Sequence, residues 1–139
     1  MEFYELVAQA EASGVAVMTR NIGRHHGRYL LKHRLIMLSP RLSGPQTISA
    51  LAHELGHAFY GDDGPQPPEL EARAWRWAAC ALITPALYAE AEVAAATTHL
   101  GAIARELGVT RQVVEAWLDA QDSMSNVRYI NFGRIEQGA

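Results

Sequence analysis

The spacing of apolar residues in the N-terminal part of the chain predicts one short helix and a small sheet. Apolar side chains recur at helical intervals over residues 2–12, which is typical of an amphipathic helix. Short apolar runs at residues 15–18, 28–31 and 34–38 predict three strands, because each run is bounded by glycine, proline or polar residues. The last two strands are expected to turn back on each other around Lys32.

From Gln46 onward the apolar spacing becomes that of helices, interrupted by segments rich in glycine and proline. Thr84 and Pro85 mark one helix start, because threonine caps a first turn and proline suits the first helical position. The segments with helical spacing are residues 46–59, the stretch from Glu69 to Leu82, a helix from Pro85, residues 99–107 and residues 111–120. In the tail, the stretch from Val127 to Ile135 is predicted as one more strand or an irregular segment.

The order of these elements predicts the α+β class. The domain should be mostly helical, with a small antiparallel sheet packed against the helix over residues 46–59. A chain of 139 residues has the size of a single domain. We therefore predict one domain over residues 1–139, with a core over about residues 1–120 and a tail of undefined structure over residues 121–139.

Composition indicates a folded protein without a membrane span. Hydrophobic residues make up 49% of the chain and charged residues 19%, so there is enough apolar material for a core. No apolar run reaches the ~20 residues that a membrane span needs. Pro85, Glu90 and Glu92 interrupt the most apolar stretch. We expect no membrane partner.

Charge and cysteine content favour a cytoplasmic protein. The acidic N-terminal segment lacks the basic start and apolar centre of a signal peptide. Cys80 is the only cysteine and cannot form an internal disulfide, which fits a reducing compartment. The net charge is −3, and the chain has no run of basic residues, which argues against a nucleic-acid partner.

Metal chemistry is indicated by an H-E-x-x-H sequence at residues 53–57, inside a predicted helix. His53 and His57 are four residues apart and share one helix face, so both imidazoles can bind the same ion. Glu54 lies about 100° around the helix from His53 and reaches a water molecule activated by the metal without binding the metal. We expect Zn²⁺ as the cofactor, because imidazole and carboxylate groups suit it, and Glu54 as the catalytic general base.

A third protein ligand is needed, and the spacing leaves several acidic residues open. Glu71 lies near the start of the next predicted helix, which could fold back and bring it beside His57. Glu69 is two residues earlier and points elsewhere on that helix. Asp63, with its neighbour Asp62, is a rival, because metzincins place their third ligand six residues after the second histidine. Acidic residues also favour the first turn of a helix for electrostatic reasons alone.

Two blocks of the chain resemble the ImmA/IrrE-type metallopeptidases of bacteria and their prophages. They read LAHELGHA at residues 51–58 and EARAWRWAACALITP at residues 71–85. The second block is similar to the E-x-x-A-[DN]-x-[FW]-A helix of that family. Residues 107–114, LGVTRQVV, resemble its closing helices, so the likeness extends over roughly residues 10–118.

The resemblance implies a zincin-like metallopeptidase fold in which Glu71 joins His53 and His57 as the third zinc ligand. It also implies a zinc endopeptidase that makes a limited cut in a cytoplasmic regulatory protein. Such a substrate is typically a helix-turn-helix repressor that governs a prophage, a mobile element or a stress regulon. The chain departs from the family at Trp75, where Asp or Asn is expected to orient a metal ligand by a hydrogen bond.

The sequence leaves two alternative functions open. Trp75 leaves open a metal-binding regulator that cleaves weakly or not at all and acts by binding a protein. Residues 102–114 also fit a DNA-binding helix-turn-helix, with Arg111 and Gln112 placed to read bases. Glu115 on the same helix and the acidic net charge argue against DNA binding.

The predicted strand over residues 34–38 bears on how a substrate would bind. As an edge strand just before the H-E-x-x-H helix, it could pair with the extended backbone of a peptide. An ordinary hairpin explains the same sequence, and the position of this strand in the sheet distinguishes the two hypotheses.

Overall fold

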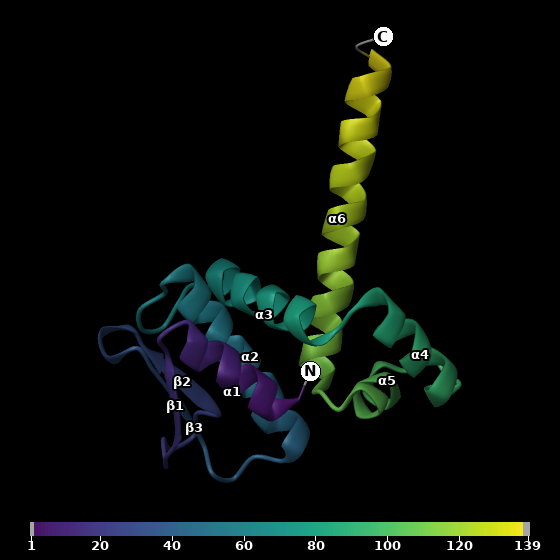
Figure 1. The fold of residues 1–139 in the computed structure, drawn as a ribbon. Coiled ribbons are helices and arrows are strands. Elements are labelled where there is room, and N and C mark those ends of the chain that lie inside the picture. Colours follow the sequence, from purple (N-terminus) through teal and green to yellow (C-terminus); the bar gives the residue numbers. More distant parts are fainter. Residues whose placement is uncertain (1, 138–139) are drawn as a thin grey trace.

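The computed structural model describes the backbone of residues 2–137 and the side chains of residues 2–124 (Figure 1). Helices dominate, and a small sheet lies at one end, which confirms the predicted α+β class. The elements are α1 (Phe3–Ala12), β1 (Ala16–Thr19), β2 (Gly27–Leu30), the 3₁₀ turn η1 (Leu31–His33), β3 (Leu35–Leu38), α2 (Gly44–Tyr60), α3 (Pro68–Leu82), α4 (Pro85–Ala95), α5 (Leu100–Leu107) and α6 (Arg111–Gln137).

The sheet is mixed, whereas the sequence predicted an antiparallel one. β2 pairs antiparallel with β3, with Gly27 opposite Leu38, as expected for the hairpin. β1 instead pairs parallel with β3, with Ala16 opposite Leu35. The loop over residues 20–26 carries the chain past β3 to the other edge, so β3 fills the space between β1 and β2.

This strand order makes β3 the central strand, and the hypothesis of an edge strand over residues 34–38 is wrong. Both sides of β3 are occupied by backbone hydrogen bonds to its neighbours. The edges of the sheet are β1 and β2. Within residues 2–137, the outer sides of β1 and β2 have no strand partner, so a further peptide could pair with either strand.

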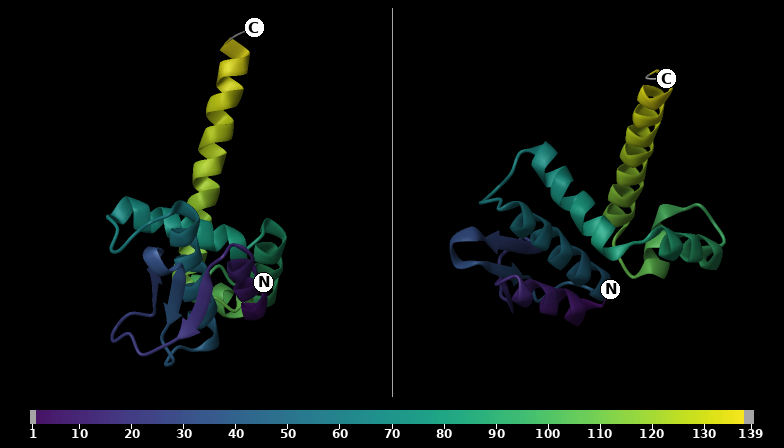
Figure 2. Two further views of the ribbon diagram at one scale, coloured as in Figure 1. Left: turned by 60° about the vertical axis from the view of Figure 1, so that its left-hand side comes forward. Right: turned by 45° about the horizontal axis from the view of Figure 1, so that its top comes forward.

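Helix α2 is the centre of the N-terminal layers, between the sheet and α3 (Figure 2). Successive side chains of β3 point to opposite faces of the sheet. Ile36 and Leu38 therefore share one face and are buried in the same apolar core as Leu51 and Ala52 of α2. Ser43 begins α2 with a capping box, since its side chain accepts the amide of Gln46 while Gln46 accepts the amide of Ser43. The helix that carries the H-E-x-x-H sequence is therefore fixed at its start and along one buried face.

Helices α2 and α3 approach closely because α2 has a glycine at the crossing point. A methyl group at Gly56 would lie only 2.7 Å from the carbonyl oxygen of Ala74, which is itself fully buried. A side chain at Gly56 would force the two helices apart, at a cost of about 1–3 kcal/mol. The close crossing brings the first turn of α3 to the histidine face of α2.

The C-terminal helices close the other end of the core. The indole Nε1–H of Trp117 in α6 donates to the carbonyl oxygen of Ile83 at 3.1 Å, and its ring stacks on Tyr88. The backbone N–H of Thr110 donates to the Ser49 hydroxyl at 3.1 Å, which ties the start of α6 to α2. Thr84 caps α4 by accepting the amide of Leu87, as predicted for the Thr84-Pro85 start.

The tail differs from the prediction. The backbone between Val127 and Ile135 is helical, as part of α6, and α6 extends beyond the body of the molecule (Figures 1 and 2). The apolar residues of this segment do not follow the full i, i+3, i+4, i+7 pattern of an amphipathic helix, so periodicity alone did not reveal the helix. Within residues 2–137, no single helix is long and apolar enough to cross a membrane. The pair α3 and α4, bent by 79°, meets that test of length and composition when the two are taken together.

Candidate metal centre

The two histidines of the H-E-x-x-H sequence lie one helical turn apart on α2 and face the first turn of α3. Their ring centroids are 4.6 Å apart. His57 is buried and His53 is half-buried, so both rings are held by their surroundings. This arrangement agrees with the helical spacing argument, in which residues four apart share a face.

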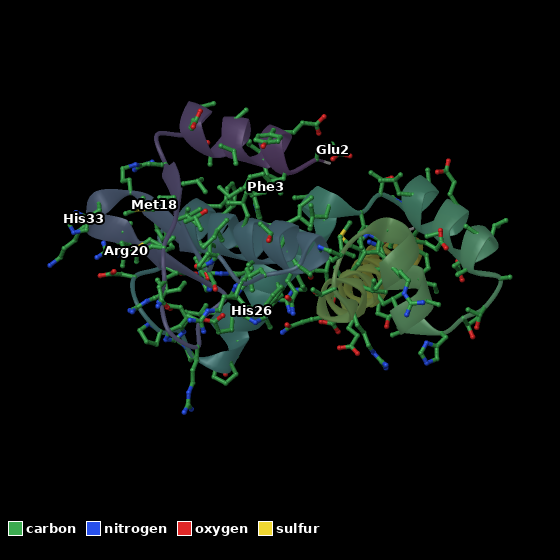
Figure 3. The ribbon with its side chains drawn as sticks, turned by 90° about the horizontal axis from the view of Figure 1, so that it is seen from below. Glu2, Phe3, Met18, Arg20, His26 and His33 are labelled. Atoms are coloured by element: carbon green, nitrogen blue, oxygen red, sulfur yellow. The ribbon has the colours of Figure 1, made fainter. Side chains whose placement is uncertain are left out.

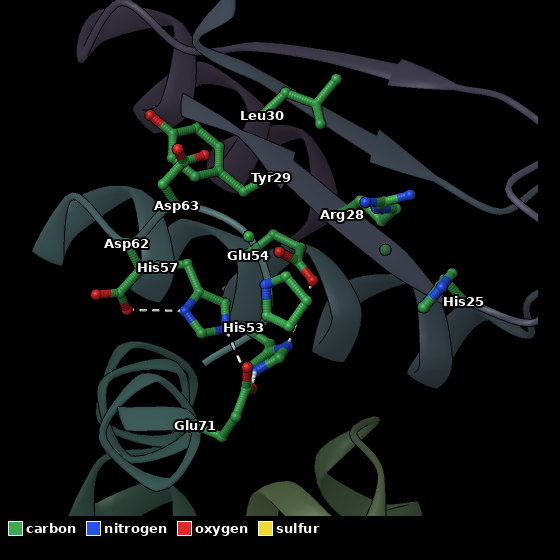
Figure 4. A pocket seen from close by; sticks show the side chains of 13 residues that line it. His25, Arg28, Tyr29, Leu30, His53, Glu54, His57, Asp62, Asp63 and Glu71 are labelled. Atoms are coloured by element: carbon green, nitrogen blue, oxygen red, sulfur yellow. Dashed lines mark hydrogen bonds and ion pairs between the residues drawn. The ribbon is translucent and has the colours of Figure 1, made fainter. Parts of the chain in front are cut away.

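Glu71 of α3 completes the cluster (Figure 4). Its Oε2 atom lies 3.0 Å from Nε2 of His53 and 3.1 Å from Nε2 of His57. The ligand atoms of these three residues all lie within 4.8 Å of one another, and the group could hold a metal ion. Among the described residues, Glu69 and Asp63 are exposed and do not join this group.

The chemistry of these atoms fits a cation. A carboxylate only accepts hydrogen bonds, so His57 carries a proton on Nδ1, which lies 2.8 Å from an oxygen of Asp62. In the neutral form of the ring, Nε2 then has only a lone pair toward the Glu71 oxygen, so in that form two acceptors face each other. A metal ion between them removes that conflict. In a tetrahedral zinc site the ligand atoms lie about 3.3 Å apart, close to the separations found here.

Asp62 is an orienting group for His57 and not a member of the cluster itself. It is buried, with 8% of its surface exposed, and its second oxygen accepts from Nη2 of Arg73 at 2.9 Å. The Arg73 guanidinium in turn lies 3.9 Å above the ring of Tyr60. This chain of contacts fixes the His57 ring with Nε2 directed at the cluster, as carboxylates commonly do for metal-binding histidines.

Loss of the Asp62 carboxylate should weaken metal binding. We expect Asp62→Ala to lower zinc affinity by about 10–100-fold, because His57 loses the bond that sets its proton and orientation. Competition with a chromophoric chelator measures this change. Asp63→Ala is the matched control, since it removes an exposed carboxylate from the same loop.

Asp62→Asn, which keeps an acceptor oxygen of the same size, should lose less affinity than Asp62→Ala. Asp62 also pairs with Arg73, so either substitution could destabilise the fold. The melting temperatures of both variants should therefore be compared with that of the parent protein. Equal zinc affinity in Asp62→Ala and the parent protein would show that His57 is held without this carboxylate.

Trp75 holds the other histidine by a different contact. Its ring stacks on His53 with centroids 4.0 Å apart and planes 10° apart. The sequence departs from the family pattern at this position, where a polar residue would hydrogen-bond a ligand. The indole instead restrains the plane of the His53 ring by packing.

Glu54 is buried at 6% exposure and faces the open side of the cluster. Its Oε1 atom is 3.5 Å from Nδ1 of His53, and it is not part of the three-residue group. A side chain at Gly27 of β2 would lie 3.0 Å from Cγ of Glu54, so glycine lets the strand pass closely over this carboxylate.

These residues share a cleft of about 470 Å³ (Figure 4). Residues 27–30 of β2 form one wall, and the Asp62–Pro65 loop with Glu71 forms another. The buried carboxylate of Glu54 and the histidine pair therefore meet bulk solvent at the base of an open groove. The groove is bordered by β2, one of the two edge strands among the described residues.

The structure thus brings together His53, His57, Glu54 and Glu71, the four residues to which the sequence analysis assigned metal-binding and catalytic roles. Asp62 was considered in the sequence only as a rival ligand, and its contact with Nδ1 of His57 gives it another role. The signal that could have revealed this role is weak. Asp62 lies five residues after His57, just past Gly61, the left-handed residue that ends α2 and turns the chain back.

A family model described as Peptidase_M78, the IrrE N-terminal-like domain, matches residues 10–119, which is most of the chain. No curated protein matches the sequence.

Proposed function

The chain belongs to the Peptidase_M78 family of IrrE N-terminal-like domains, and on this premise we propose that it is a zinc-dependent endopeptidase. The family match confirms the resemblance to ImmA/IrrE metallopeptidases that the two sequence blocks indicated. The observation that carries the proposal is the convergence of two imidazole Nε2 atoms and one carboxylate oxygen beside a buried glutamate in an open cleft.

In this proposal His53, His57 and Glu71 hold the zinc ion. When bound, zinc supplies a Lewis acid that polarises a carbonyl group and makes water acidic near neutral pH. Asp62 and Trp75 keep the two histidine rings in place, by a hydrogen bond and by stacking respectively. The ligands are thereby oriented before the metal arrives, which reduces the entropy lost on binding.

Glu54 acts as the general base and then as a general acid. Its carboxylate takes a proton from the attacking water as the new C–O bond forms on the scissile carbonyl carbon. The same oxygen returns the proton to the amide nitrogen as the C–N bond breaks, so the amine leaves neutral. Burial of Glu54 beneath β2 holds the carboxylate in one place for both transfers.

The free edge of β2 gives the cleft a means of holding a peptide. An extended chain that pairs with residues 27–30 gains backbone hydrogen bonds and lies along the wall of the cleft. Its scissile bond then passes Glu54 and the histidine pair. A flexible or locally unfolded segment of a protein fits this geometry, whereas an intact helix satisfies its own backbone groups and cannot pair with a strand.

We propose as substrate a cytoplasmic helix-turn-helix repressor, cut once, as the family resemblance implies. The test is to incubate the zinc-loaded protein with a repressor encoded beside its gene and to follow intact masses. We expect two fragments that sum to the repressor plus one water. A chelator should stop their formation, and added zinc should restore it. Cleavage that continues in the chelator would contradict a metal-dependent peptidase.

A further inference from the structure

The charges of the chain are divided between two regions. Residues 12–53 contain no aspartate or glutamate, although the whole chain has 15 acidic residues. Six of its 12 lysine and arginine residues lie in this stretch, spread at intervals so that they form no basic run. The stretch includes the whole sheet and the start of α2. A molecule with a mild net charge of −3 therefore has one strongly basic region.

The cations of this region are not neutralised by neighbours. Arg34 donates to the backbone carbonyls of Ser13 and Gly14. Among residues 2–124, the other five make no ion pair and no side-chain hydrogen bond, and all five are exposed: Arg20, Arg24, Arg28, Lys32 and Arg41. By contrast, three arginines outside the region pair with acids: Arg73, Arg76 and Arg111. The exposed arginines of the sheet layer thus carry uncompensated charge.

Part of this charge lines the cleft. Arg28 of β2 and His25 of the loop before β2 border the same cleft as Glu54 (Figure 4). Arg24 and His26 border an adjoining hollow of about 350 Å³ that also reaches Glu54. On the opposite wall Asp62 is paired with Arg73 and Glu71 belongs to the three-residue metal cluster, whereas Asp63 lines the cleft as an exposed carboxylate. Beside the metal cluster and Glu54, the cleft and its adjoining hollow therefore present two exposed arginines, Arg24 and Arg28, against one exposed acid, Asp63.

The basic residues continue onto the face of the sheet turned away from α2. Figure 3 shows this side, with Met18, Arg20, His26 and His33 in view. A shallow hollow there is lined by Arg20, Arg28 and His33 around Leu35 and Met37, which are only half-buried. A basic rim around apolar side chains suits a polypeptide segment with both acidic and apolar residues.

We infer that the cleft and the sheet layer beside it select an acidic polypeptide, with Asp or Glu residues flanking the bond at Glu54. The inference rests on the proposed function, since it names the chemistry of the substrate for that same cleft. A peptide paired with β2 has its flanking side chains next to Arg24 and Arg28. Unpaired arginines along a cleft attract opposite charge and raise the rate of association.

An acidic polypeptide fits these observations better than nucleic acid does. The basic residues border the cleft that contains Glu54 and the cluster of His53, His57 and Glu71, the groups to which the proposed function assigns peptide cleavage. The hollow on the outer face has aliphatic side chains at its floor, and the aromatic residue of β2, Tyr29, is buried and cannot stack on bases. The free edge of β2 recognises a peptide backbone.

The test measures binding, with fluorescent peptides of equal length and one shared apolar centre. One is flanked by Asp and Glu, one by Ser and one by Lys. The protein is the full chain with Glu54→Gln, loaded with zinc so that no peptide is cut. By fluorescence anisotropy at low salt, we expect the acidic peptide to bind at least about tenfold more tightly than the lysine peptide. The difference should shrink as the Debye length falls from about 10 Å at 0.1 M salt to about 3 Å at 1 M.

Charge reversal locates the effect. Arg24→Glu with Arg28→Glu should remove the preference for the acidic peptide or invert it. Arg76→Glu with Arg105→Glu, which changes the net charge equally but lies outside the basic region, should leave the preference intact. Equal affinity for the three peptides, or the same loss in both double variants, would overturn the inference. Tighter binding to a short DNA duplex than to the acidic peptide, lost in Arg24→Glu with Arg28→Glu, would assign this surface to nucleic acid instead.

These experiments test the acidic preference and the peptidase function separately. If the acidic peptide binds selectively but the parent protein cuts neither peptides nor repressor, the proposed peptidase function is wrong and the acidic preference stands. If the parent protein cuts the lysine and acidic peptides equally well, the peptidase function stands and the acidic preference is wrong.

Discussion

Replacing Glu54 by glutamine is expected to lower the rate of substrate cleavage by about 10²–10⁴-fold while the bound zinc is retained. The amide has nearly the size of the carboxylate but cannot accept a proton from water at neutral pH. Glu54 is not one of the three residues whose ligand atoms converge, so metal content should stay at about one ion per chain. Cleavage rate by intact-mass spectrometry and zinc by elemental analysis measure the two effects on the same sample.

The size of the substitution matters at this position. Glu54 lies against Gly27, so a larger residue would push β2 away, whereas glutamine fits the same space. Glu54→Gln protein should therefore still bind the substrate and can capture it from a cell extract. If Glu54→Gln regulates its target as well as the parent protein does, cleavage is not the function, and the alternative of a metal-binding regulator is correct.

The second large effect concerns the metal itself. His57→Ala should reduce bound zinc from about one ion per chain to well below that level, because His53 and Glu71 alone hold zinc weakly. Glu71→Gln should lower zinc affinity more than tenfold, since the amide is a poor ligand. Glu69→Gln is the matched control on the same helix, and it should bind zinc normally.

Asp63→Asn distinguishes the remaining ligand hypothesis. The Asp63 side chain is exposed, and it should be replaceable without loss of zinc. If Asp63→Asn loses zinc while Glu71→Gln retains it, the third ligand comes from the loop after α2, as in metzincins. Full zinc content in His57→Ala would contradict the site as a whole.

The sequence predicted the helices up to residue 120, because each of them buries apolar residues at helical spacing, whereas the continuation of α6 to Gln137 was not predicted. Helix α2 is an example, since its apolar stripe and its histidine face were separable from spacing alone. Glu71 was harder, because an acidic residue in the first turn of a helix has an electrostatic explanation of its own. The family resemblance implied Glu71, and the close crossing at Gly56 gives the physical reason why it reaches the histidines.

Features that depend on contacts between distant segments were not predictable. The parallel pairing of β1 with β3 depends on the path of the loop between β1 and β2. The alternation of apolar and polar residues along a strand does not reveal that path. The contact of Trp75 with His53 depends on which face of α3 meets α2. The basic region escaped detection because its cations are separated along the chain, and only the folded sheet gathers them at one cleft.

The most direct test of the central claim is anomalous diffraction at the zinc absorption edge from crystals of the zinc-loaded chain. We expect one anomalous peak, at about 2.0–2.2 Å from Nε2 of His53, Nε2 of His57 and Oε2 of Glu71. No peak among these three atoms, or a peak bonded to Asp62 or Asp63 in place of Glu71, would contradict it.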